Sequence, residues 1–217
     1  MEVAGPNVSQ ILGEPVELMN SGVPNLPEGQ DDEASVVAYG RFEGLSGTMP
    51  LVLRNQTNAP LMRLAVSAQG RDAAGNLVAS GEDQGFTPNL VPPGGLAIGY
   101  VYFGNDVELP AGTEVSFETS GRQVDDSTET IRDLELVEAN HVREQIVGSV
   151  RNPSDSEVAG PIGVSLMCFS SNGRVLHHEI AFANEDALPP GGSATFNVDL
   201  LDRECPAFLA GASGFAY

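Results

Sequence analysis

Three histidines are candidate metal ligands, and two of them are adjacent. His177 and His178 lie in the segment VLHHEIAF, whose composition and alternation are typical of a β-strand. Neighbouring side chains on a strand point to opposite faces, so the pair cannot hold one ion without a further ligand such as His141. We therefore interpret the pair as part of an ordinary half-exposed strand, with a histidine metal site as the alternative.

A short acidic run is the second candidate for metal binding. Asp125, Asp126 and Glu129 lie in DDSTE, within a polar stretch, residues 120–133, that is poor in apolar residues. Carboxylate oxygens are ligands that calcium prefers, but the run lacks the Asp-x-Asp-x-Asp-Gly spacing of an EF-hand. We favour a solvated linker here, with calcium bound by these three carboxylates as the candidate site; no other cofactor is expected.

Two cysteines, Cys168 and Cys205, are too far apart to form a Cys-x-x-Cys redox or zinc motif. An even number at wide spacing suits one structural disulfide made in an oxidising compartment. We predict a Cys168–Cys205 disulfide, with two buried free thiols as the alternative.

The sequence contains no recognisable catalytic motif. The segments GLSGT and GASGF have the wrong spacing for a Gly-x-Ser-x-Gly nucleophile turn, and PPGGLAIG lacks the Lys and the Ser or Thr of a phosphate-binding loop. Carboxylates are so numerous that no pair stands out as the acid and base of a glycosidase. We expect a protein that is not an enzyme.

The charge balance excludes two classes of partner. The chain has 30 Asp and Glu against 10 basic residues, giving a formal net charge of −20, and every basic residue is Arg. Such a surface repels nucleic acid and anionic lipid head groups. There is no apolar run long enough to span a membrane, and the N-terminus lacks the basic and apolar regions of a signal peptide. We interpret the chain as the mature segment of an extracellular or cell-surface protein, with a lipid anchor or a signal sequence as the alternatives for a removed N-terminal segment, and with a cytosolic protein as the alternative to this location.

Short strands separated by turns are the elements that must position these residues, and they occur in two copies. Arg54-Asn55 recurs as Arg151-Asn152, and the Pro-Pro-Gly-Gly sequence at 92–95 recurs at 189–192, both at a spacing of 97 residues. The hairpin glycine Gly75 recurs as Gly173. A period of this length indicates duplication of a whole domain rather than a solenoid repeat. Because Pro-Pro cannot donate to a ladder and Gly-Gly tolerates positive φ, each Pro-Pro-Gly-Gly predicts a reversal between strands.

The two copies resemble FxLYD-type domains and, more broadly, the immunoglobulin-like modules of bacterial surface proteins and lipoproteins. The second copy is more similar to them, in VGSVRNPSDSEV, GVSLMCFSSNGRVL and LPPGGSATFNV; the first has LVLRNQTNAPL, LAVSAQGRDAAGNLV and LVPPGGLAIGYVYF. The signature that names the family is replaced by AQGRD in the first copy and LMCFS in the second. The resemblance implies a sandwich fold, an extracellular setting and no enzymatic activity.

The predicted fold is all-β, with two tandem immunoglobulin-like β-sandwich domains and an extended N-terminal arm. About seven short strand-like segments per copy, with turn residues between them, support this prediction. We place the arm at residues 1–34, the first domain at 35–119, the acidic linker at 120–130 and the second domain at 131–217.

The predicted function is that of a non-enzymatic binding or scaffold protein, acting through sandwich faces or edge strands. One alternative is a self-assembling filament subunit, in which the arm of one copy adds as a strand to the sheet of the next. The other is a calcium- or ligand-binding protein that uses the region between the domains. The segment YVYF places Tyr100 and Tyr102 on one face of a strand, where they contact a partner or pack between the domains.

Overall fold

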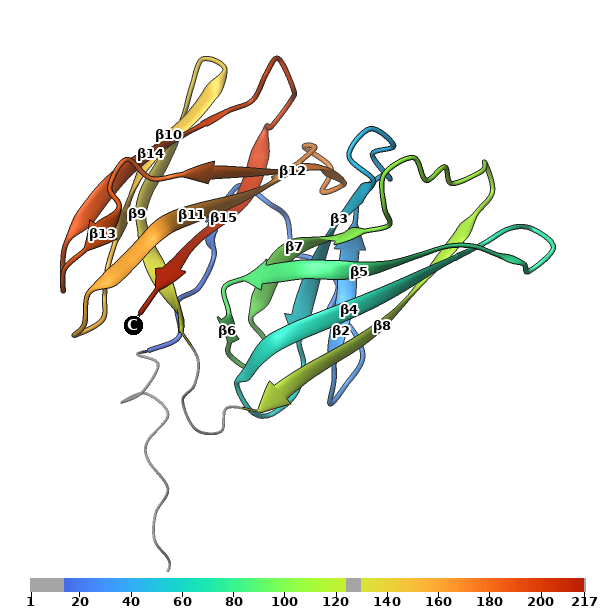
Figure 1. Ribbon diagram of the computed structural model, residues 1–217, viewed down its shortest axis with the longest axis horizontal. Coiled ribbons are helices and arrows are strands. Elements are labelled where there is room, and N and C mark those ends of the chain that lie inside the picture. Colours follow the sequence, from blue (N-terminus) through green and yellow to red (C-terminus); the bar gives the residue numbers. More distant parts are fainter. Residues whose placement is uncertain (1–13, 124–129, 217) are drawn as a thin grey trace, which may run out of the picture.

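The computed structural model describes residues 14–123 and 130–216, and these residues form strands and turns without a helix (Figure 1). The all-β prediction is therefore confirmed for the described residues. No helix that could cross a membrane occurs in this part of the chain.

The strands form two antiparallel sheets. The first sheet contains β2 (Ala34–Tyr39), β3 (Thr48–Asn55), β4 (Leu61–Arg71), β5 (Leu77–Thr87), β6 (Leu90–Val91), β7 (Leu96–Tyr102) and β8 (Glu114–Gln123). The second contains β1 (Met19–Ser21), β9 (Ile131–Val142), β10 (Gln145–Arg151), β11 (Val158–Phe169), β12 (Val175–Phe182), β13 (Ala187–Leu188), β14 (Ser193–Asp199) and β15 (Ala207–Phe215).

The strand pairing of the first sheet recurs in the second. The series β2–β3–β7 corresponds to β9–β10–β14, and β4 pairs with β5, β6 and β8 as β11 pairs with β12, β13 and β15. The sequence repeat thus has a counterpart in the ladders.

Two ladders distinguish the copies. A ladder joins β5 to β7 in the first sheet, whereas β12 and β14 are joined only by an isolated bridge between Ala183 and Phe196 just beyond β12. Conversely, β15 pairs with β9 in the second sheet, whereas no ladder joins β8 to β2 among the described residues. These differences decide which strand edges are open.

Each Pro-Pro-Gly-Gly forms a tight turn that is bonded to a buried asparagine. The amide of Gly94 donates to the carbonyl of Asn55 at 2.6 Å, and the amide of Gly191 donates to that of Asn152 at 3.0 Å. Both asparagine side chains are fully buried, and each donates from Nδ2 to two backbone carbonyls at 2.8–2.9 Å. The repeated sequence is therefore a structural corner, as the turn residues predict.

Alternating apolar residues build a separate core in each half. Along β14, for example, Ala194, Phe196 and Val198 are buried and the residues between them are exposed. Full burial of one large apolar side chain contributes about 1.5–3 kcal/mol. The first core is formed in the same way around Leu51, Leu53 and Val66.

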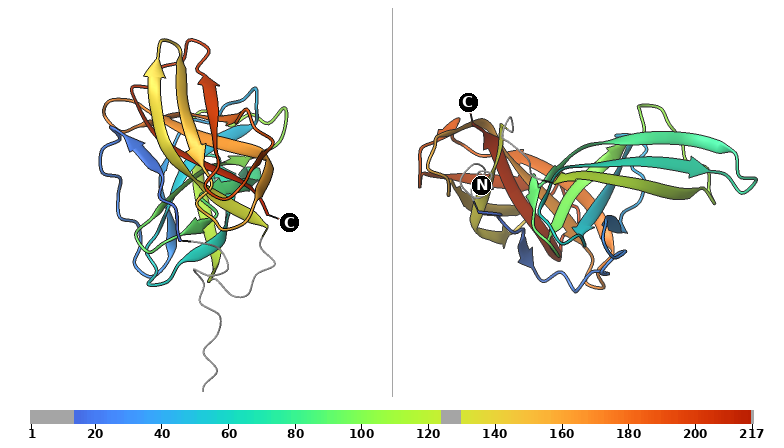
Figure 2. Two further views of the ribbon diagram at one scale, coloured as in Figure 1. Left: turned by 90° about the vertical axis from the view of Figure 1, so that its left-hand side faces the viewer. Right: turned by 90° about the horizontal axis from the view of Figure 1, so that it is seen from below.

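A third apolar cluster joins the two halves. Val52 and Ile98 of the first sheet pack against Met167, Phe169 and Leu209 of the second, and all five are almost completely buried. The N-terminal segment, drawn in blue, runs along this junction, and its Val23 belongs to the same cluster (Figure 2). The halves are therefore held together by buried apolar surface.

Polar contacts fix the same junction. The carboxylate of Asp133, on β9, accepts hydrogen bonds from the amides of Asn89 and Leu90 at 2.7 and 2.9 Å. Asn89 lies between β5 and β6, and Leu90 is the first residue of β6, so one side chain of the second half binds the connection between two strands of the first. Such charge-assisted bonds are stronger than bonds between neutral groups.

Candidate functional site

The predicted Cys168–Cys205 disulfide is present, and both cysteines are buried in the second core. It links β11 to the segment that leads into β15. The sulfurs therefore stabilise one end of the second sheet and are not free to bind a ligand.

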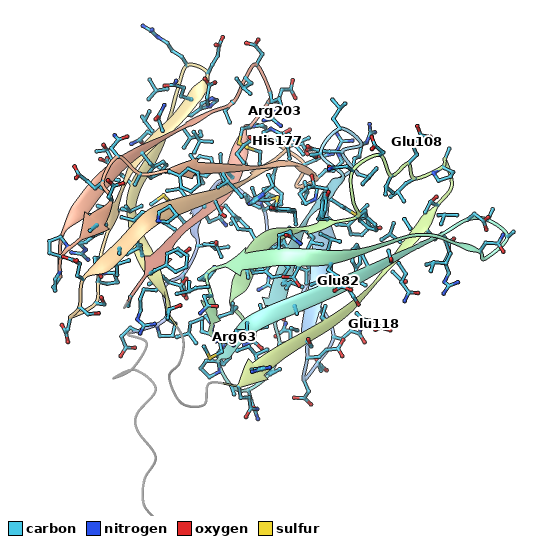
Figure 3. All side chains as sticks on the ribbon, viewed as in Figure 1. Arg63, Glu82, Glu108, Glu118, His177 and Arg203 are labelled. Carbon is cyan, nitrogen blue, oxygen red and sulfur yellow. A yellow bond between two sulfur atoms is a disulfide. The ribbon has the colours of Figure 1, made fainter. Side chains whose placement is uncertain are left out.

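His177 is a structural residue next to this disulfide. Its Nδ1 lies 2.7 Å from the carboxylate of Glu179, and its Nε2 lies 3.0 Å from the backbone carbonyl of Glu204. Arg203 forms an ion pair with the same carboxylate at 2.6 Å (Figure 3). Both ring nitrogens are thus occupied. The network ties β12 to the segment that carries Cys205.

His178 points to the other face of β12, as strand geometry predicts, and packs at the junction. Its ring centroid lies 5.5 Å from that of Tyr100. Burial lowers the pKa of His178 to about 4, and its buried Nε2 has no hydrogen-bond partner. The side chain is therefore a neutral packing group at neutral pH, and Tyr100 takes the packing role that we gave as an alternative.

The structure does not bring the three histidines together. His141 lies on an exposed part of β9, and the described residues contain no group of three His, Cys, Asp or Glu that could hold a metal. The two adjacent histidines lie on a half-exposed strand, as we interpreted them, because residues of β12 alternate between buried and more exposed positions. His177 is on the buried side and is only 5% exposed, because the segment at Arg203 and Glu204 covers it.

The candidate calcium ligands Asp125, Asp126 and Glu129 lie outside the described residues. The calcium site at these carboxylates stays a prediction. A rise in melting temperature on addition of millimolar calcium to the full chain would support it.

The N-terminal arm supplies β1, which adds to the edge of β15. Met19 pairs with Ala210 and Ser21 with Phe208, and Met19 packs against the second core. Farther along the same edge, residues 131–134 of β9 pair with residues 212–215. The outer edge of β15 is therefore covered along most of its length.

The corresponding edge of β8 has no ladder at residues 114–118 and is called open here; beyond them, the hydroxyl of Thr119 donates to the backbone carbonyl of Ala34 on β2. Gly70 lies five residues before the hairpin glycine Gly75, and Cys168 lies five residues before its counterpart Gly173, so the two positions correspond. Gly70 pairs with Val115 on β8, and Cys168 pairs with Phe208 on β15. Residues 115–117 are therefore the counterparts of residues 208–210, which β1 covers. Among the described residues, β8 has no ladder partner other than β4.

A groove lined by apolar residues together with Arg41, Thr113 and Glu114 lies beside this open edge. Its volume is about 610 Å³. Its lining includes Tyr39, Phe42, Met49, Leu109 and Val115. The rings of Tyr39 and Phe117 lie 5.2 Å apart at the open edge. The groove therefore offers apolar contacts to a strand placed beside β8.

Acidic side chains line the outer face of the same strand. Glu114, Ser116 and Glu118 are exposed, whereas Val115 and Phe117 turn toward the first core. No described residue forms an ion pair with Glu114 or Glu118. Local sequence shows the alternation of this strand, but not that its edge is open, because an edge is defined by the absence of a distant partner.

No family model matches the sequence, and no curated protein is significantly similar to it. The resemblance to FxLYD-type and immunoglobulin-like domains stays a prediction, and the function is argued from the geometry described above.

Proposed function

We propose that the protein is a non-enzymatic binding and scaffold protein of the cell exterior, built from two tandem immunoglobulin-like sandwiches, and that it binds a partner through the edge of β8. The observation that carries this proposal is the contrast between the two copies. The edge of β15 is covered by β1, whereas its counterpart on β8 has no ladder at residues 114–118 and borders a groove lined in part by apolar side chains. The buried disulfide supports an oxidising location.

Strand addition is the mode of binding that this geometry supports. An edge strand presents backbone N–H and C=O groups that an extended segment can bond, while its side chains occupy adjacent hollows. Each backbone bond contributes about 0.5–1.5 kcal/mol. The contact between β1 and β15 is an example of such addition within this chain.

Selection of short random peptides against the full-length protein, followed by amide hydrogen exchange, tests the proposal. We expect selected peptides to slow exchange in β8 at residues 114–118. The variant Val115→Arg, which replaces an apolar side chain of the groove by a long charged one, is expected to abolish that protection. Peptides that protect only other segments of the protein would contradict the proposal.

A second candidate function, self-assembly through the arm, is favoured by one observation. The ladder of β1 with β15 contains only three residue pairs. Few hydrogen bonds would therefore have to break within one chain before β1 could form the same ladder with β15 of a second chain. Light scattering over a range of concentrations at high salt tests this candidate, since salt screens the repulsion between copies. A mass that stays monomeric at all concentrations would exclude it.

A further inference from the structure

The inner side of the open β8 edge selects apolar side chains. A strand placed beside β8 would alternate with the same period, so every second side chain would lie next to Val115 or Phe117. Both residues pack against the first core, and the groove beside them is lined by Tyr39, Phe42 and Leu109. In the second sheet, the apolar Met19 of β1 faces the core in the equivalent place.

The outer side of the edge selects positive charge. Glu118 pairs in register with Ser67 of β4, which pairs in turn with Glu82 of β5, so two carboxylates flank a small residue in one row across three strands. Figure 3 shows both glutamates on the first sheet. Glu114 lies two positions before Ser116 on the same face of β8. Outward side chains of an added strand would lie next to Glu114 and Glu118.

Few cations near the edge compensate these carboxylates. Arg71 is the ladder partner of Glu114, but its guanidinium donates to the carbonyl of Gly75 and to the side chain of Gln69. Arg41 lines the groove and is exposed. The acidic row is therefore available to a basic partner.

A second copy of this chain does not fit the edge. The arm around β1 contains Glu14 and Glu17 and has no basic residue between residues 14 and 24. Each copy also carries a net charge of −20. Like charges on adjacent strands are destabilising, so the charges that would attract a basic strand repel another arm.

We infer that the β8 edge binds an extended segment of a basic protein, in which Lys or Arg alternates with large apolar residues. The basic side chains pair with Glu114 and Glu118, and the apolar side chains enter the groove beside Val115. This inference rests on the proposed function, because it names the class of partner for the same strand edge.

Synthetic peptides of about ten residues test the inference on the full-length protein. One peptide alternates Lys with Val and Leu, a second has the same composition in scrambled order, and a third alternates Thr with Val and Leu. At physiological salt we expect the alternating basic peptide to bind about tenfold more tightly than either of the others. We also expect it to slow amide exchange at residues 114–118.

Protein variants separate the β8 carboxylates from the general negative field. The double variant Glu114→Gln/Glu118→Gln is expected to weaken binding of the alternating basic peptide by about fivefold or more. The matched control Glu144→Gln/Glu157→Gln makes the same change in net charge on exposed residues of the second half, and is expected to change binding by less than about twofold. Unchanged melting temperatures would show that both variants are folded.

The remaining outcomes separate the two proposals. Equal binding of the scrambled peptide, or equal weakening by the control variant, would show attraction to an acidic surface only and would overturn the inference. If the Thr peptide slows exchange in β8 as much as the alternating basic peptide does, the inference of a basic partner is contradicted, whereas strand addition at β8 is still supported. If no peptide slows exchange at residues 114–118, the proposed function itself fails.

Discussion

At the scale of single residues, His178 couples folding to pH. Its ring lies at the junction beside Tyr100, and burial lowers its pKa from 6.5 to about 4, while Glu179 opposes the shift and His177 adds to it. Below pH 6.5 the unfolded chain gains a proton that the folded chain does not. The free energy of unfolding therefore falls as the pH falls from 6.5 toward 4, by at most about 3 kcal/mol from this residue.

The variant His178→Phe tests this coupling, because it keeps an aromatic ring against Tyr100 without the titrating group. Urea unfolding of both proteins at several pH values should show a smaller loss of stability in the variant between pH 6.5 and 4. His141→Phe, at an exposed position, is the matched control and should keep the slope of the parent protein. Equal slopes for the parent protein and His178→Phe would contradict the prediction.

Asn55 and Asn152 make equivalent contributions at the two Pro-Pro-Gly-Gly corners. Each side chain donates two hydrogen bonds and accepts others while fully buried, so replacement by Ala leaves backbone carbonyls without partners. We expect Asn55→Ala and Asn152→Ala each to lower the free energy of unfolding by about 2–4 kcal/mol. The exposed Asn140, replaced in the same way, should show almost no loss in denaturant unfolding.

At the scale of elements, the disulfide fixes the end of β11 to the segment before β15. The cysteines are separated by 37 residues, for which loop-closure entropy gives a stabilisation of about 4 kcal/mol. We expect Cys168→Ala/Cys205→Ala to unfold at a clearly lower denaturant concentration than the parent protein. After treatment with a reductant, the parent protein should unfold at a denaturant concentration close to that of the variant. A variant as stable as the oxidised parent would contradict this role.

The strands themselves were predictable because their signals are local. Alternation over residues 61–69 predicts a strand, which the structure extends to Arg71 as β4, and the Pro-Pro-Gly-Gly turns lie where the sequence places them. Alternation fails at β2. The sequence places Val37 and Tyr39 on one face, but the ladder shifts between Val36 and Ala38, so Val37 packs at the junction while Tyr39 contacts Phe117. A bulge of this kind has no reliable local signal.

The candidate site was not predictable from the sequence, because it depends on pairing between distant segments. The segment GTEVSFET shows that Val115 and Phe117 share one face of a strand, but not that β8 lacks an outer neighbour. Likewise, the arm gives no local indication that Met19 pairs with Ala210, almost at the other end of the chain. The histidines and the acidic run attracted attention by residue type, which does not report on three-dimensional clustering.

At the scale of the whole molecule, Asp133 fixes one half to the other. Its two bonds to the amides of Asn89 and Leu90 are lost in Asp133→Ala, which leaves those donors without their partner at the junction. We expect a loss of about 2–4 kcal/mol in the free energy of unfolding. Glu138→Ala, on an exposed part of the same strand, is the control. Equal stability of the two variants would show that the apolar cluster alone holds the halves together.

The position of β1 also sets an order of events during synthesis. The ribosome makes β1 well before its partner residues 208–210. At 5–20 residues per second, the arm waits roughly 10–40 s for that partner. The first sheet can close during this time without the arm. Docking of β1 onto β15 is then a step that follows synthesis of both sheets.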